Sequence, residues 1–128
     1  METDNFEPWE RTESLPQNLY FYGLESGVGN ITVLLKGLDT EDKILKLTFI
    51  GVLSYRVTQE TARTKTIYEN PNLRGFKVAT NSEYLRWFKE ESAGMFDDMN
   101  LMHYFISNID NIIDIIGGPP VKVEWVSA

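Results

Sequence analysis

The stretch "FIGVLSYRVTQETAR", from Phe49 to Arg63, carries the strongest indication of how this chain folds. Apolar residues stand at alternate positions through most of it, as in a β-strand with one buried face. Gly51 interrupts the alternation and predicts a bulge or a bend, because glycine adopts backbone conformations that other residues avoid. Arg56 lies among the residues that face away from the apolar side, so the partner of its charge becomes the central question.

Alternating segments of the same kind lie on both sides of this stretch, and turn sequences such as "LESGVGN" separate them. They are "NLYFYG" (18–23), "NITVLLKGL" (30–38), the run with Leu45, Leu47 and Phe49 at odd positions, "GFKVAT" (75–80) and "VKVEWV" (121–126). Two further apolar segments, "LMHYFIS" (101–107) and "IIDII" (112–116), lie in the tail. Many short strands joined by tight turns favour an antiparallel sheet, arranged as a meander or a sandwich.

One segment, "TNSEYLRWFKEESAGMF", has the periodicity of a helix. Thr80 or Ser82 is expected to cap it, and Thr80 with Glu83 has the spacing of a capping box. The sequence therefore predicts an α+β fold that is mainly antiparallel β-sheet, with one main helix at about residues 81–93 packed on one face.

The chain is long enough for one domain with a real core. Residues 1–16 hold five acidic groups and two prolines, which indicates an acidic N-terminal arm, and Phe6 and Trp9 are the residues expected to pin it. Residues 17–128 are predicted to form a single α+β domain.

The composition restricts the possible partners and surroundings. There is no cysteine, and the N-terminal sequence is acidic without an apolar segment, so a reducing, cytoplasmic location is expected. No apolar run is long enough to cross a bilayer. The formal charge of −7 opposes nucleic acids and anionic lipids, and it favours a basic protein partner.

No common catalytic or metal-binding motif is present. A Ser–His–acid triad would have to use His103, the single histidine, with Ser54 or Ser92 and Asp114, and no serine lies in a G-x-S-x-G elbow. One imidazole without cysteine is a poor basis for a transition-metal site. We therefore expect no catalytic residue, no metal, no cofactor and no enzymatic activity.

The charged group after the strand allows two interpretations. Tyr55 and Arg56 point to opposite faces of a strand, and a helical turn over residues 59–64 would make Glu60 and Arg63 neighbours. The partner of Arg56 would then be Glu60 or a more distant carboxylate, such as Glu83, Glu90 or Asp114. A guanidinium that holds a carboxylate serves equally to fix a strand or to grip an anion.

Four segments together carry a resemblance: "FIGVLSYRVTQETAR", "NSEYLRWFKEES", "HYFISNIDNIIDII" and "PPVKVEW". Over about residues 17–125 the chain resembles a group of small, uncharacterised proteins of Bacillus-type bacteria. These proteins are often encoded near polymorphic secreted toxins and are suspected of being immunity proteins. The resemblance implies a non-catalytic protein that neutralises a cognate toxin, and it assigns no functional residues.

A binding module of this kind would steer a basic partner, such as a toxin domain, with exposed carboxylates and hold it with central aromatic and charged side chains. The candidate binding residues are Glu41, Asp42, Glu90, Asp97, Asp98, Tyr55, Arg56, Glu60, Arg63 and Trp87. Either a monomer or a homodimer is compatible with the sequence. The alternative is a small-molecule-binding domain with an aromatic-lined pocket built from Tyr20, Tyr22, Tyr55, Trp87 and Trp125.

Overall fold

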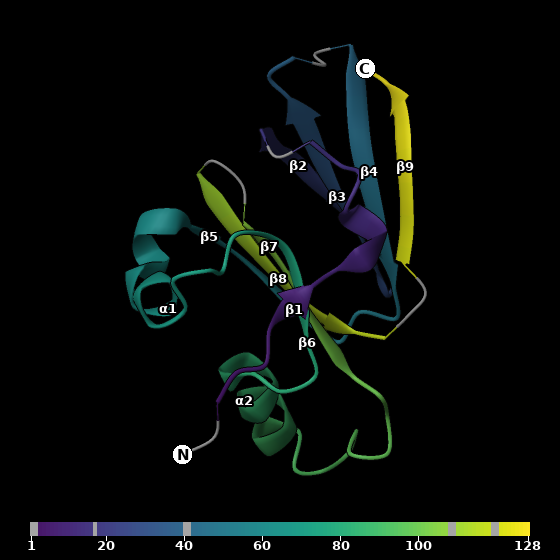
Figure 1. The fold of residues 1–128 in the computed structure, drawn as a ribbon. Helices are drawn as coiled ribbons and strands as arrows, with labels where there is room; N and C mark the ends of the chain where they lie inside the picture. The colour runs from purple at the N-terminus through teal and green to yellow at the C-terminus, as the bar shows by residue number, and fades with distance from the viewer. Residues whose placement is uncertain (1–2, 17, 40–41, 108–109, 119–120) are drawn as a thin grey trace.

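The computed structural model of this chain describes residues 3–16, 18–39, 42–107, 110–118 and 121–128, and it contains two antiparallel sheets (Figure 1). The five-stranded sheet has the order β1 (Glu7–Pro8), β6 (Gly75–Ala79), β7 (Met102–Ser107), β8 (Asn111–Gly117) and β5 (Ser54–Gln59). The four-stranded sheet has the order β2 (Leu19–Ser26), β3 (Asn30–Gly37), β4 (Lys43–Ile50) and β9 (Val121–Ser127). The prediction of a mainly antiparallel α+β fold is confirmed.

The helices are few and short. They are α1 (Thr64–Glu69), α2 (Glu83–Glu91) and two 3-10 turns, η1 (Glu10–Thr12) and η2 (Glu60–Arg63). The predicted main helix matches α2 roughly, since α2 ends two residues earlier than expected, where Ala93 and Gly94 take positive φ angles. The helical turn expected over residues 59–64 is present as η2, and it continues directly into α1.

Gly51 transfers the chain from one sheet to the other. It follows β4 with a φ of +71°, a conformation that glycine adopts without strain. The N–H groups of Gly51 and Val52 both donate to the carbonyl of Gly29, at 2.9 and 3.1 Å. β5 then pairs with β8 in the other sheet. The alternating stretch that begins at Phe49 is thus divided between two sheets, and the bend expected at Gly51 lies between them.

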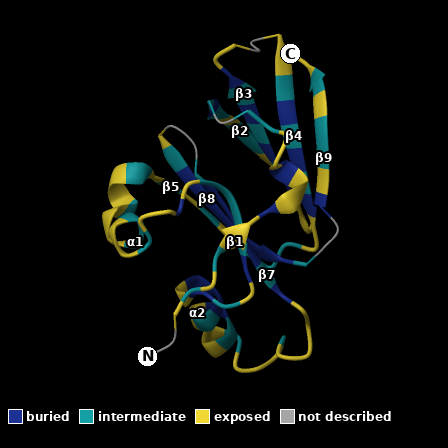
Figure 2. Cartoon of the chain, in the orientation of Figure 1, coloured by how far each residue is buried: buried dark blue, intermediate teal, exposed yellow. Residues whose placement is uncertain are grey.

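The main core fills the space between the sheets. Alternate residues of β3 and β4, such as Val33 and Leu47, meet Ile113 and Ile115 of β8 there. All four are fully buried, which fits the alternation read from the sequence (Figure 2).

Helix α2 and the segment around α1 cover the other face of the five-stranded sheet (Figure 1). Tyr84, Leu85 and Phe88 of α2 pack with Ile116 of β8. Because β8 is covered on both faces, it carries a nearly continuous apolar sequence rather than a strict alternation. Asp114 is the exception inside this run.

The acidic N-terminal segment is built into the fold over its described part. Asp4 accepts hydrogen bonds from the backbone N–H of Glu83, at 2.9 Å, and from Arg86, at 2.8 Å, both on α2. β1 adds to the edge of the five-stranded sheet beside β6, and Trp9 enters the core between the sheets. Phe6 packs beside α1 as part of a smaller cluster with Phe105.

Within the described residues, no helix is long and apolar enough to cross a membrane.

We expect Gly51→Ala to lower the free energy of unfolding by about 1–2 kcal/mol, because an L-residue is strained at positive φ. A Cβ at this position meets no atom within 4 Å, so the loss would come from the backbone alone. Gly27→Ala is the matched control, since a Cβ there is equally unobstructed and the φ angle is not positive. Urea unfolding of both variants measures the difference, and equal stabilities would contradict the role given to Gly51.

Candidate functional site

The most unusual feature of the interior is a carboxylate that is fully buried at the middle of β8. Asp114 Oδ1 accepts a hydrogen bond from His103 Nε2 at 2.6 Å. Oδ2 accepts one from Arg56 Nε at 2.9 Å and another from Arg63 Nη1. An ionised carboxylate can only accept, so the proton between His103 and Asp114 resides on Nε2. We call these four side chains the Asp114 cluster.

Strand register brings the cluster together from distant parts of the chain. Arg56 of β5 lies directly opposite Asp114, and Phe105 of β7 lies opposite it on the other side. His103 is two residues from Phe105 and therefore shares its face of the sheet. Arg63 comes from η2, which follows β5 and turns back over the same face. The structure thus selects Asp114 among the carboxylates considered for Arg56.

The second nitrogen of His103 connects the cluster to α2. Nδ1 lies 2.7 Å from Ser82 Oγ, so the hydroxyl and the ring nitrogen share a hydrogen bond. Ser82 is also the N-cap of α2, where its Oγ accepts from the N–H of Leu85 at 3.1 Å. One hydroxyl therefore fixes both the start of the helix and the orientation of the histidine.

Ser82, His103 and Asp114 form a serine–histidine–aspartate chain, but its surroundings do not suit nucleophilic catalysis. Ser82 is 0% exposed, so its hydroxyl cannot reach a substrate. The same oxygen also accepts the N–H of Leu85 at the start of α2. The two serines considered from the sequence lie elsewhere: Ser54 bonds to the hydroxyl of Tyr84, and Ser92 donates to the carbonyl of Phe88.

The environment of Asp114 favours its charged form. Burial by itself would raise the pKa of Asp114, but the hydrogen bond and charge of His103 act in the opposite direction. Arg63 and Arg56 add to this effect, and together these neighbours hold the pKa well below its usual range. Asp114 is therefore ionised at neutral pH, where it serves as the common acceptor for its three neighbours.

A short stack of side chains leads from this cluster to the surface. The guanidinium carbon of Arg56 lies 4.1 Å from the ring centroid of Tyr84, within the range of a cation–π contact. Trp87 stacks on Tyr84 with 5.7 Å between centroids and 12° between planes. Trp87 nevertheless remains 51% exposed. An aromatic ring is thus held in a fixed position on the outside of α2.

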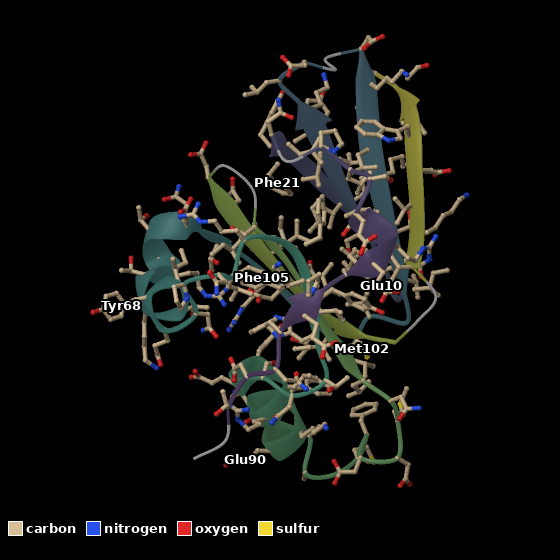
Figure 3. The ribbon with its side chains drawn as sticks, viewed as in Figure 1. Glu10, Phe21, Tyr68, Glu90, Met102 and Phe105 are labelled. Atoms are coloured by element: carbon tan, nitrogen blue, oxygen red, sulfur yellow. The ribbon has the colours of Figure 1, made fainter. Side chains whose placement is uncertain are left out.

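Carboxylates surround this ring on the helix. Glu83 precedes Trp87 by four residues, and Glu90 and Glu91 follow it by three and four. At these spacings all three are its neighbours on the helix surface. Figure 3 shows Glu90 on α2. The turns that follow α2 expose two methionines and two further carboxylates, Met95, Asp97, Asp98 and Met99. We call these eight residues the α2 surface.

The residues predicted for binding do not form one site. Arg56 and Arg63 belong to the Asp114 cluster, whereas Trp87, Glu90, Asp97 and Asp98 belong to the α2 surface. Three others lie elsewhere, with Tyr55 on the face of β5 opposite Arg56, Glu60 at the start of η2, and Asp42 exposed before β4. Glu41 lies outside the described residues.

Sequence reasoning missed Ser82 as the partner of His103. The two residues are 21 positions apart, and no local pattern connects a helix cap to a strand histidine. The helix-cap signal identified Ser82 as a candidate cap, but its second hydrogen bond depends on how α2 docks on the sheet.

The aromatic-lined pocket considered as an alternative does not match the cavities found. One cavity of about 730 Å³ lies between β5, α1 and β8, where Tyr68 projects from α1 into solvent (Figure 3). Another of about 440 Å³ lies beside Trp9 and β6. Neither is lined by Tyr20, Tyr22, Tyr55, Trp87 or Trp125. The described residues also contain no group of three histidine or acidic side chains placed to hold a metal ion.

Comparison with protein-family models, curated proteins and solved structures found no match to this chain.

Removing a guanidinium should destabilise the fold according to how deeply it is buried. The side chain of Arg63 is 10% exposed and that of Arg56 is 40% exposed. We expect Arg63→Met to lower the free energy of unfolding by about 3–5 kcal/mol, as for a broken buried pair, and Arg56→Met by about 1–2 kcal/mol. Arg74→Met, at an exposed arginine, is the control and should change it by less than about 0.5 kcal/mol. Chemical denaturation measures all three, and a larger loss for Arg56 would reverse the assignment.

The cluster also predicts how stability depends on pH. The pKa of Asp114 is lower in the folded state than its ordinary value of 3.8, so the unfolded chain binds more protons below that pH. This contribution should be complete above about pH 5 and should fall as the solution becomes more acidic. Urea unfolding between about pH 5 and pH 2 should therefore show a shallower pH dependence for Asp114→Asn than for the wild type. Asp110→Asn, at an exposed carboxylate, should retain the wild-type slope.

Proposed function

We propose that this chain is a non-catalytic protein-binding module that holds a basic partner protein on its α2 surface. The observation that carries the proposal is Trp87, a large aromatic side chain that is half exposed and yet fixed by stacking on a buried tyrosine. The resemblance described above names the class of partner, a toxin domain encoded near this protein. In that role the chain would act in the cytoplasm as an immunity protein.

Trp87 has the properties of an energetic anchor. Tryptophan is enriched among the residues that contribute most to protein interfaces, because it buries a large area with little loss of side-chain freedom. The stack on Tyr84 reduces that loss further, since the ring is already ordered in the free protein. The hydroxyl of Tyr84 contacts Ser54 Oγ at 2.5 Å, so its ring is fixed in turn by β5.

The carboxylates of the α2 surface supply the charge that a basic partner requires. Five of its eight members are acidic, and the other three are apolar or aromatic. An apolar centre with a charged rim is the usual organisation of a specific interface. Carboxylates on a rim accelerate encounter with a positive surface, while the centre determines how long the complex lasts.

The proposal excludes catalysis because the groups that perform it are engaged in the fold. His103, Ser82 and Asp114 are each buried and satisfy one another. The chain has one histidine and no cysteine, so the α2 surface offers neither an imidazole base nor a thiolate nucleophile.

Trp87→Ala should weaken the complex with the product of a neighbouring toxin gene by about 2 kcal/mol or more, close to thirtyfold in Kd. Trp125→Ala is the matched control, because Trp125 is also exposed but lies on β9 of the other sheet. Calorimetric titration of both variants against the toxin domain measures the difference. Equal effects of the two substitutions would remove the α2 surface as the binding site.

The charge part of the same experiment uses association kinetics. The pair Glu90→Gln and Glu91→Gln should slow association, and the difference from the wild type should disappear as salt is added. Glu10→Gln with Glu13→Gln, at exposed carboxylates near η1, is the control pair. Co-expression with the toxin decides the function itself: no rescue of growth and no complex on a sizing column would overturn the immunity proposal.

A further inference from the structure

The edges of the two sheets differ in how well they are protected from pairing with another strand. Exposed edges are normally blocked by a bulge, a proline, short length or outward-pointing charges. β1 is two residues long and ends in Pro8, and β2 has a register irregularity between Phe21 and Gly23. β9 carries Lys122 and Glu124. β5 lacks these features: it is six residues long and pairs regularly along its whole length.

The charge on β5 does not protect its edge either. Arg56 is its only charged residue, and the guanidinium is directed over the sheet to Asp114 and Tyr84. On the opposite face, Tyr55 and Val57 are 44% and 38% exposed. These two apolar side chains extend beyond the cover provided by the four-stranded sheet.

The backbone groups of β5 that point outward can be identified from the ladder. Glu60 N–H donates to the carbonyl of Asp110 at 2.9 Å, in the same register as the β5–β8 pairs. Since hydrogen-bonded positions alternate in an antiparallel ladder, Arg56 and Thr58 direct their N–H and C=O groups toward β8. Tyr55, Val57 and Gln59 direct theirs toward the open edge, where no strand of the described chain pairs with them.

We propose that β5 pairs with β5 of a second copy of this chain, joining the two five-stranded sheets into one antiparallel sheet. A two-fold axis at Val57 sets Val57 against Val57 and Tyr55 against Gln59, so the outward backbone groups of both copies meet. Arg56 then lies opposite Thr58. If the axis lay one residue earlier, at Arg56, the two copies of Arg56 would lie opposite each other. Like charges directly opposite each other are unfavourable. The register centred on Val57 avoids this repulsion.

The pairing has a consequence for the rest of the surface. The two-fold axis of such a pair is perpendicular to the sheet, so both copies of α2 lie on the same side of it. Arg56 and Tyr84 connect β5 to Trp87 within each copy. The dimer thus presents two α2 surfaces in one direction. The inference does not depend on what those surfaces bind.

Sedimentation equilibrium of the full chain over a range of concentrations tests the proposal. The mass should rise from 14.8 kDa toward twice that value. Val57→Lys should raise the dimer dissociation constant at least about tenfold, since it puts like charges opposite each other on the axis. Val28→Lys is the matched control, because Val28 is fully exposed in the turn between β2 and β3, and it should leave the constant unchanged.

Amide hydrogen exchange of the wild type gives a second measurement that needs no variant. The N–H groups of Tyr55, Val57 and Gln59 should exchange slowly at concentrations where the dimer forms and quickly on dilution, while Arg56 and Thr58 stay protected throughout. A mass of one chain at every concentration would overturn the proposal. A dimer that Val57→Lys does not weaken, or one in which the three amides stay unprotected, would place the contact elsewhere and would overturn it equally.

Discussion

The buried charge of Asp114 is the constraint on which the rest of the five-stranded sheet depends. A carboxylate without partners inside a protein costs several kcal/mol, so its ionised form is tolerated only where donors satisfy both oxygens. Here the donors come from β5, β7 and η2. If β5 shifted by one residue, Arg56 would point to the wrong face, and Asp114 would lose that partner. The charge therefore selects the register of the strands on both sides of β8.

The same constraint extends to α2. His103 donates through Nε2–H to Asp114, and its Nδ1 is hydrogen-bonded to the hydroxyl of Ser82. Because Ser82 is also the helix cap, the start of α2 is tied to the centre of the sheet. Tyr84 follows two residues later and covers Arg56, and Trp87 stacks on Tyr84 at the surface. The exposed ring is thus the last member of a series of contacts that begins at a buried carboxylate.

Most strands could be predicted from the sequence because alternation is a local property. The run from Ile31 to Leu35 and that from Leu45 to Phe49 both show it, and each became a strand with the expected face buried. The chain passes from one sheet to the other at Gly51, and in the sequence this crossing shows only as an interruption of the apolar alternation. A glycine in an alternating run fits a bulge as well as a crossing, and the choice depends on which distant strand pairs with β5.

The candidate site was predictable only in part, for a related reason. Arg56 attracted notice because a charge inside an alternating strand needs a partner, and Asp114 was one of four carboxylates considered for that partner. Their pairing, however, follows from the order of strands in the sheet, which no local signal provides. The cation–π contact of Arg56 and the cap at Ser82 depend further on the angle at which α2 docks. The α2 surface was more accessible to prediction, since helical spacing alone places Trp87 among its carboxylates.

Arg56 was expected either to fix a strand or to grip an anion, and the groups that its guanidinium already contacts help to weigh the two roles. Arg56 Nε donates to Asp114 and the planar face of the guanidinium lies over Tyr84, although the side chain remains 40% exposed. Arg63 is almost completely buried and donates to the same carboxylate. An added anion would have to compete with a fixed, ionised acceptor in a region of low dielectric, where that acceptor is strongest. The contacts of the two arginines therefore favour a structural role for the Asp114 cluster.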